Sequence, residues 1–264
     1  MSDFKEGAPC WADVSLPDLA AGRRFYGELF GWTFQDQGEE FGHYTMAQRD
    51  GKNAAALMEK MDPSMPTAWS VYIASDDAAK TAAKITEAGG QLAFGPDAIG
   101  DTGVMLGAID PGGSFFGVWQ GGAHPGFDVV NEPGAFCWTE NHTRDADAVD
   151  VFYEAVFGYD ARQIGDGAGF DYKVWTLPGD PEAQVGGRMR RGEDLPADVP
   201  SAFQIYFVVA DCDGAADTVR RLGGQVVMEP QDSPFGRMAI VADDQGAHFA
   251  VIDVERRTGE IPGQ

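Results

Sequence analysis

Gly7-Ala8-Pro9-Cys10-Trp11 opens a stretch that runs on to Arg24-Phe25-Tyr26-Gly27-Glu28-Leu29-Phe30-Gly31, and this stretch occurs twice in the chain. A shift of 127 residues places Trp11 on Trp138 and aligns residues 7–31 with 134–158 without a gap. Ten of the 25 aligned positions are identical. An internal repeat decides the architecture before any local pattern does, because each copy must fold in a similar way.

Length and charge narrow the class of protein. The 264 residues fit two domains of about 130 residues, each large enough for a core of its own. With 19 Lys and Arg against 42 Asp and Glu, the formal charge is −23. Such a surface repels nucleic acid and anionic membranes. We therefore expect no nucleic-acid partner and no membrane partner.

The cysteines and the first residues of the chain predict its compartment. Cys10 and Cys137 are equivalent in the repeat, Cys212 stands alone, and no two cysteines form a CxxC pair. An odd number of widely spaced cysteines indicates free thiols in a reducing compartment. Residues 1–6 contain no apolar run of the kind that opens a signal peptide. The sequence therefore predicts a cytoplasmic protein.

Each half of the chain repeats one order of elements. Residues 10–16 alternate like a half-buried strand, and Asp18 and Gly31 are suited to cap a helix between them. Three short strands are expected next, and the same order then restarts near Trp69. The expected division is a first domain at 1–121, a linker at 122–133, a second domain at 134–254 and a tail at 255–264.

Two motifs carry a resemblance to a known family. Phe25-Tyr26-Gly27-Glu28-Leu29-Phe30-Gly31-Trp32 and Asp110-Pro111-Gly112-Gly113-Ser114-Phe115-Phe116-Gly117 resemble the helix and turn signatures of the vicinal oxygen chelate superfamily. This group includes glyoxalases, bleomycin-resistance proteins and extradiol dioxygenases. The resemblance implies an α+β fold of four βαβββ modules. These pair into two glyoxalase-like domains, each a U-shaped mixed sheet around a cleft.

Enzymes of this family hold a divalent metal in the cleft, usually through His, Glu or Gln. The resemblance places the ligand positions of this chain at Trp11, Ser70, Gly117, Trp138, Gln204 and Ala250. A metal site needs three or more nitrogen or oxygen donors, mostly imidazole or carboxylate. We therefore expect no metal and no cofactor in either cleft.

Strand alternation predicts which side chains share the cleft face in the first half. Trp11, Asp13, Tyr72 and Trp119 are the candidate ligand-binding residues there. Aromatic rings with one carboxylate suit a flat, apolar ligand oriented by a single polar contact. The alternative is that the rings simply fill a closed core.

The second half offers a more polar set. Trp138, Gln204 and Tyr206 are its candidate ligand-binding residues. Glu140 and His142 lie two apart on one strand, and His248 lies on another. These three are the candidate catalytic residues, because a carboxylate with two imidazoles can transfer protons. An ordinary buried polar network and a metal bound at a shifted place are the alternatives.

Two further features of the sequence do not indicate a function. Arg188, Arg190 and Arg191 form a basic cluster in an acidic chain, and a solvated edge is the favoured interpretation. His124 lies in the linker and receives no role.

Three functions remain in competition. The favoured one is a metal-independent binding protein of the bleomycin-resistance type for an apolar or aromatic, natural-product-like compound. The second is a glyoxalase-like lyase or isomerase, or a natural-product tailoring "hydroxylase", that uses the second-domain cleft. The third is an interaction protein whose clefts are closed cores. The oligomeric state stays open, since the internal duplication makes a monomer sufficient.

Overall fold

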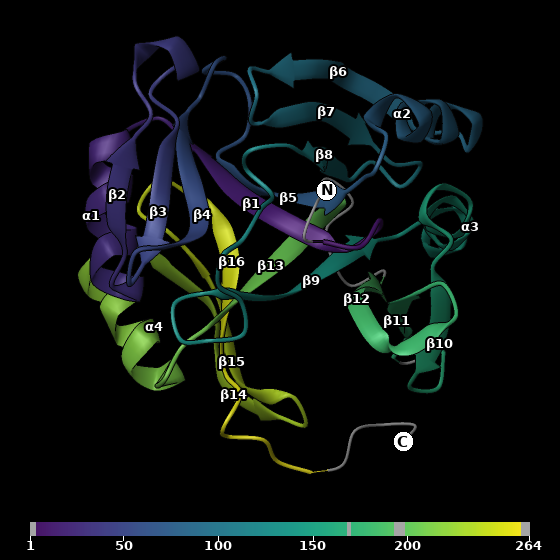
Figure 1. Ribbon diagram of the computed structural model, residues 1–264. Helices are drawn as coiled ribbons and strands as arrows, with labels where there is room; N and C mark the ends of the chain where they lie inside the picture. Colours follow the sequence, from purple (N-terminus) through teal and green to yellow (C-terminus); the bar gives the residue numbers. More distant parts are fainter. Residues whose placement is uncertain (1–3, 168–169, 193–198, 260–264) are drawn as a thin grey trace.

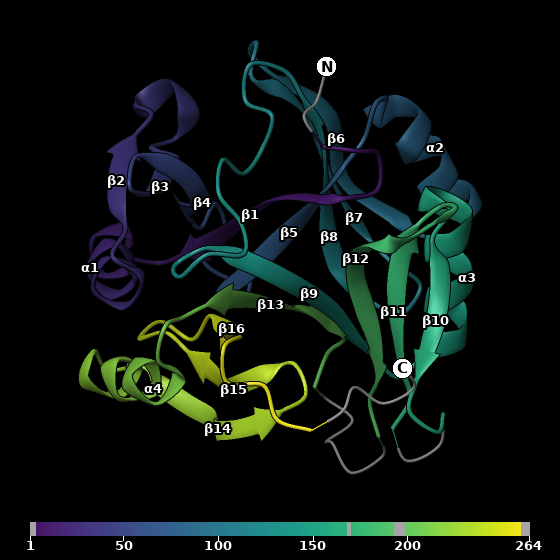
Figure 2. The same ribbon diagram turned by 60° about the horizontal axis from the view of Figure 1, so that its bottom comes forward.

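The computed structural model describes residues 4–167, 170–192 and 199–259. Within these residues the strands form two mixed sheets of eight strands each, flanked by four α-helices. The predicted α+β fold of four βαβββ modules is confirmed, and Figures 1 and 2 show the two sheets side by side.

The first sheet comes from the first half of the chain. Its elements, with the short 3-10 helix η1, are β1 (Pro9–Leu16), α1 (Leu19–Phe30), β2 (Thr33–Asp36), η1 (Glu39–Phe41), β3 (Thr45–Arg49), β4 (Lys52–Glu59), β5 (Ala68–Ala74), α2 (Ala78–Glu87), β6 (Gln91–Ile99), β7 (Gly103–Ile109) and β8 (Phe115–Gly121). The strand order is β2-β3-β4-β1-β5-β8-β7-β6. The antiparallel pair β1 and β5 therefore lies at the centre, between two arms.

The second sheet repeats this arrangement. Its elements are β9 (Phe136–Thr143), α3 (Ala146–Phe157), β10 (Asp160–Ile164), β11 (Tyr172–Leu177), β12 (Asp180–Arg190), β13 (Ala202–Val208), α4 (Cys212–Arg221), β14 (Gln225–Ser233), β15 (Gly236–Ala242) and β16 (His248–Asp253). The order is β10-β11-β12-β9-β13-β16-β15-β14, with β9 and β13 at the centre.

Each of the two large cores joins a module of one half of the chain to a module of the other half. One core combines side chains of the first and fourth modules, such as Tyr26 of α1 and Phe249 of β16. The other combines the second and third modules, such as Phe116 of β8 and Phe152 of α3. Helix α1 accordingly lies beside α4, and α2 beside α3 (Figures 1, 2). The two halves thus share their hydrophobic cores.

The two sequence motifs meet across the halves. The Tyr26 hydroxyl of the helix motif donates to Asp243 Oδ2 over 2.8 Å, and Tyr153 donates to Asp110 Oδ2 over 3.2 Å. Asp110 opens the turn before β8, and Asp243 opens the matching turn before β16. All four side chains are buried. The motifs therefore connect each half to the other through a matched pair of buried hydrogen bonds.

A second reciprocal contact explains the glycine that opens each repeat. Gly7 and Gly134 have φ of +87° and +86°, which side-chain-bearing residues rarely adopt. The carbonyl of Gly7 accepts from the Tyr159 hydroxyl at 2.5 Å, and that of Gly134 accepts from Trp32 Nε1 at 2.6 Å. Tyr159 and Trp32 are themselves equivalent in the repeat. Each half thus anchors the start of the other.

Local signals predicted the helices better than the strand ends. Helix α1 begins after Asp18, whose Oδ1 accepts from the Ala21 amide at 3.0 Å, and it ends before Gly31, as predicted. Strands β6 and β14 each run for nine residues, longer than the short strands that the sequence predicts, and register shifts interrupt their pairing. The three cysteines are free, as predicted. No helix in the described residues is both long and apolar enough to cross a bilayer.

Candidate functional site: two equivalent clefts

A hydrogen-bonded group of four side chains lies on the cleft face of the first sheet. Asp13 of β1 accepts at Oδ2 from the hydroxyls of Tyr72 (2.9 Å) and Tyr44 (3.0 Å). Trp11 Nε1 donates to the Tyr44 hydroxyl over 2.7 Å. The alternation of β1 places Trp11 and Asp13 on one face, and pairing with β5 sets Tyr72 opposite Trp11. The structure thus brings three of the predicted residues together.

The second sheet carries the same group. Trp138 Nε1 donates to the Tyr172 hydroxyl over 2.9 Å. Glu140 accepts from Tyr172 at Oε1 (3.1 Å) and from Tyr206 at Oε2 (3.2 Å). Trp11, Asp13 and Tyr72 each have a counterpart at the same place in the second half, with Glu140 replacing Asp13. The duplication therefore preserves an indole, a carboxylate and two tyrosines.

The second cleft adds an imidazole. His142 Nε2 lies 2.9 Å from Glu140 Oε2, and its counterpart in the first half is Ser15. The His142 side chain is 19% exposed and that of Glu140 is 13% exposed, so both reach solvent. A carboxylate that contacts one imidazole nitrogen orients the ring, and such a positioned pair is an arrangement suited to proton transfer.

The sequence analysis missed Tyr44 and Tyr172, although each links the indole to the carboxylate. Tyr44 lies 33 residues after Trp11, whereas Tyr172 lies 34 residues after Trp138. The loop before the third strand is thus one residue longer in the second half, and the ungapped alignment ends before it. One inserted gap would have revealed the matching tyrosines.

The other predicted residues lie around these groups. Gln204 is paired with Glu140 across β9 and β13, but its Nε2 donates to the Ile205 carbonyl at 3.4 Å. His248 is exposed at the start of β16, and in the described residues no hydrogen bond or ion pair joins it to Glu140 or His142. Trp119 donates through Nε1 to the His124 carbonyl at 2.9 Å. His248 therefore lies outside the cluster that Glu140 and His142 form.

The residues at the family's metal positions do not fit a metal ion. Gly117 and Ala250 lie opposite Tyr72 and Tyr206 in the sheets and carry no donor side chain. A Cβ added to Gly117 would lie 2.2 Å from the Tyr72 ring, so this ring fills the space that a ligand side chain would need. Within the described residues, no group of three or more His, Cys, Asp or Glu side chains is placed to hold a metal.

The two clefts differ in burial. Asp13 is 2% exposed, and burial raises its pKa to about 6 despite the two tyrosine hydrogen bonds that favour its charged form. Burial likewise raises the pKa values of Tyr44 and Tyr72. Trp11 is 4% exposed, whereas its counterpart Trp138 is partly exposed. The first cleft is therefore closed, and the second reaches solvent.

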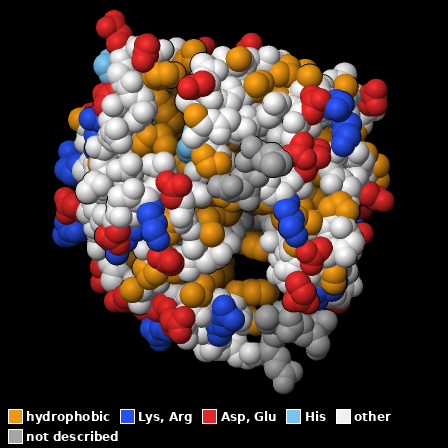
Figure 3. Space-filling view, viewed as in Figure 1, with side chains coloured by type: hydrophobic (Ala, Val, Ile, Leu, Met, Phe, Trp, Pro, Cys, Tyr) orange, Lys and Arg blue, Asp and Glu red, His pale blue; other side chains and the backbone are white. Residues whose placement is uncertain are grey.

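The surface view agrees with this difference. Figure 3 shows a deep hollow in the lower half of the molecule, between the arm of β14–β16 and the arm of β10–β12. Apolar side chains appear on its wall. The second cleft is thus open on this face.

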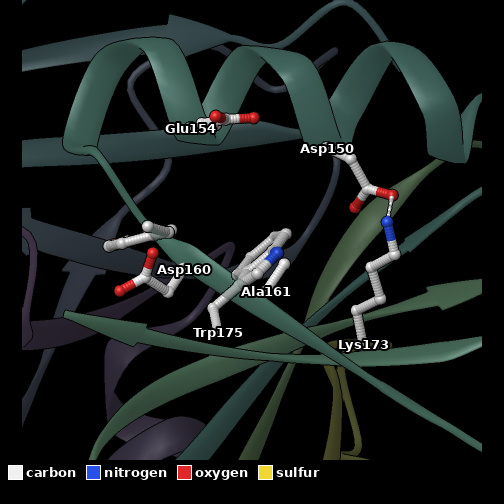
Figure 4. A pocket seen from close by; sticks show the side chains of 7 residues that line it. Asp150, Glu154, Asp160, Ala161, Lys173 and Trp175 are labelled. Carbon is white, nitrogen blue, oxygen red and sulfur yellow. Dashed lines mark ion pairs between the residues drawn. The ribbon is translucent and has the colours of Figure 1, made fainter. Parts of the chain in front are cut away.

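A separate pocket of about 270 Å³ lies outside the clefts, where α3 covers β10 and β11. In Figure 4, Asp150 and Glu154 project from α3, and Lys173 reaches Asp150, with an ion pair of 2.7 Å. Asp150 also pairs with Arg188 (2.8 Å), which is 1% exposed and pairs with Asp171 as well (2.7 Å). The interpretation of Arg188 as part of a solvated edge was wrong, because two carboxylates hold it inside the domain.

A family model described as the Glyoxalase/Bleomycin resistance protein/Dioxygenase superfamily matches residues 11–117 and 136–251. The chain therefore belongs to this superfamily, as the two motifs indicated.

Two named relatives cover nearly the whole chain. A putative glyoxylase, CFP32, of Mycobacterium bovis is 38% identical over 95% of this chain and 96% of its own length. The anthracycline biosynthesis protein DnrV of Streptomyces peucetius is 34% identical over 96% of both chains.

Solved structures share the fold at low identity. The 2,2',3-trihydroxybiphenyl 1,2-dioxygenase of Sphingomonas wittichii has a TM-score of 0.66 at 14% identity, covering 98% of this chain and 93% of its own. The Mn(II)-bound glyoxalase of Novosphingobium aromaticivorans has a TM-score of 0.62 at 13% identity, covering 97% and 87%. These similarities support the fold and leave the chemistry to the residues of this chain.

Proposed function

We propose that the protein binds a small, planar, largely apolar molecule in the second cleft without using a metal. This proposal rests on the exposure and the fixed position of the Trp138 indole. Its indole is partly exposed, its Nε1 is held by Tyr172, and in the described residues no other aromatic ring contacts it. A fixed, solvent-facing indole beside a few polar groups is the usual composition of a site for aromatic ligands.

The polar end of the site would orient the ligand. Glu140 accepts three hydrogen bonds from protein groups, so its lone pairs are partly committed. His142 has a second ring nitrogen, Nδ1, which has no hydrogen-bond partner within residues 4–167, 170–192 and 199–259. A hydroxyl or carbonyl on the ligand would bond to this ring. A planar ligand with a polar substituent agrees with the similarity to a relative named for anthracycline biosynthesis.

The proposal is tested by calorimetric titration with hydroxylated planar aromatics, such as 2-naphthol and 1,5-dihydroxynaphthalene. Wild-type protein should bind at least one of them with a stoichiometry of one. Trp138→Leu should weaken binding tenfold or more, whereas Trp11→Phe in the closed first cleft should not. Binding that survives Trp138→Leu unchanged would place the ligand elsewhere.

Acid–base catalysis is the second candidate, and the contact between Glu140 Oε2 and His142 Nε2 favours it. The imidazole would take a proton from a carbon next to a carbonyl of the bound molecule and return it, which is the proton transfer of a lyase or isomerase. Proton NMR in D₂O separates the two candidates. An enzyme would exchange that C–H for deuterium and lose the exchange in His142→Ala, whereas a binding protein would leave the ligand unlabelled.

A further inference from the structure

The linker between the two halves crosses the first cleft from one arm to the other. Its residues 122–129, here called the cover, begin at the β6–β7 arm, where the Gly122 amide donates to the Thr102 carbonyl at 2.8 Å. The Phe127 amide then donates to Cys10 of β1 at 2.8 Å. At the β4 arm, the Asp128 amide donates to the Asn53 carbonyl at 2.8 Å. The cover is therefore fixed at both arms and at the centre.

The cover places two rings on the indole of the first cleft. The His124 imidazole lies edge-on to Trp11, with ring centroids 4.5 Å apart and an interplanar angle of 84°. The Phe127 ring lies 5.3 Å from the same indole. Both distances fall in the range of favourable aromatic contacts. His124 Nε2 is buried and has no hydrogen-bond partner among the described residues. Burial also lowers the pKa of this side chain, so the ring that packs against Trp11 is neutral.

The second cleft has the same indole but no counterpart of the cover among residues 199–259. After β16 the chain turns back, and the Thr258 amide donates to the Ser233 carbonyl at 3.0 Å at the end of β14. This segment therefore stays on one arm instead of crossing. Trp138 accordingly remains partly exposed.

We infer that the cover fills the first cleft in the way that a ligand fills the second. The ligand of the second cleft would then be a neutral molecule of two linked or fused rings, at least one of them a heteroaromatic ring placed edge-on to Trp138. This inference rests on the proposed function and narrows its ligand class. The two clefts share the Trp–Tyr–carboxylate–Tyr group, so the space over Trp138 corresponds to the space that His124 and Phe127 fill over Trp11.

Residues next to the shared Trp–Tyr–carboxylate–Tyr group differ between the two clefts. The counterpart of Trp119, which donates to the cover backbone, is Ile252, so the second cleft lacks that N–H donor. The counterpart of Ser15 is His142, next to Glu140. The ligand should therefore carry its polar substituent towards Glu140 and His142, and an apolar edge towards Ile252.

The test uses 4-phenylimidazole at pH 8, where its imidazole is neutral, as a probe with the two rings of the cover. Binding is followed by calorimetry and by the ¹H–¹⁵N NMR signals of the indoles, assigned by Trp→Phe variants. In wild-type protein we expect one site and a shift of the Trp138 signal. His124→Ala opens a ring-sized space against Trp11, so a second site and a shift of the Trp11 signal should appear.

Two matched variants complete the design. His124→Leu keeps the space filled and should retain a single site. His124→Ser serves as a second opening variant if the indole spectrum shows that His124→Ala loses its fold.

The outcomes separate this inference from the proposed function. One site in wild type and still one site in a folded opening variant would overturn the inference, because the first cleft would then not resemble a ligand site. Binding of naphthols at Trp138 without binding of 4-phenylimidazole would also overturn it while the proposed function stands. If neither class binds, both are wrong.

Discussion

The hydroxyl of Tyr26 donates to the carboxylate of Asp243 over 2.8 Å, and 217 residues separate the two in the chain. The same hydroxyl accepts from Trp69 Nε1 at 3.1 Å. The helix motif of the first module and the turn of the fourth are therefore parts of one buried contact. The motif residues that carry the family resemblance therefore also join the two halves of the chain.

Removing that hydroxyl should destabilise the protein. Tyr26→Phe leaves Asp243 Oδ2 and Trp69 Nε1 without a hydrogen-bond partner among the described residues, which should cost about 2–4 kcal/mol in the free energy of unfolding. Tyr153→Phe should cost less, because the Tyr153 hydroxyl is 3.2 Å from Asp110 and that carboxylate keeps Asn141 at 2.6 Å. Urea unfolding of both variants measures the difference. Equal losses would show that the contact to Trp69 adds nothing.

Much of the fold could be predicted because the repeat and the motifs are local patterns. Capping by Asp18 and Gly31 fixed both ends of α1 from a few residues. The pairing of the first module with the fourth could not be predicted in the same way. It depends on the contact of Tyr26 with Asp243, and nothing in either segment alone indicates its partner.

The site was partly predictable for a similar reason. Strand alternation put Glu140 and His142 on one face, and they do contact each other. It could not show that the linker would place His124 on Trp11, because a loop has no period from which its path can be inferred. Arg188 was misjudged because its partners, Asp150 and Asp171, come from other elements.

The buried carboxyl of the first cleft predicts a pH dependence of stability. The pKa of Asp13 is raised to about 6, so the native state holds its proton over a range where the unfolded state has lost it. Stability should therefore fall as the pH rises from about 4 to about 6, by about 3 kcal/mol for this group. Asp13→Asn should lack this decline. Urea unfolding of both proteins from pH 4 to 8 measures it, and parallel curves would contradict the assignment.

The buried arginine predicts a large loss of stability. Arg188→Met removes the buried partner of Asp150 and Asp171, which then keep only the more exposed Lys173 and Arg190, and it should cost about 3 kcal/mol. Arg220→Met is the matched control, because Arg220 pairs with Glu229 on the surface and its loss should change little. Thermal and urea unfolding provide the comparison. A small effect of Arg188→Met would mean that solvent reaches this pair in solution.

The central claim is that the open second cleft holds the ligand on Trp138, and a titration of 2-naphthol into wild-type protein, Trp138→Leu and Trp11→Phe tests it most directly. The account predicts one site of equal affinity in wild type and Trp11→Phe, and a loss of at least tenfold in Trp138→Leu. Unchanged binding by Trp138→Leu, or no binding by wild type across the naphthol series, would contradict it.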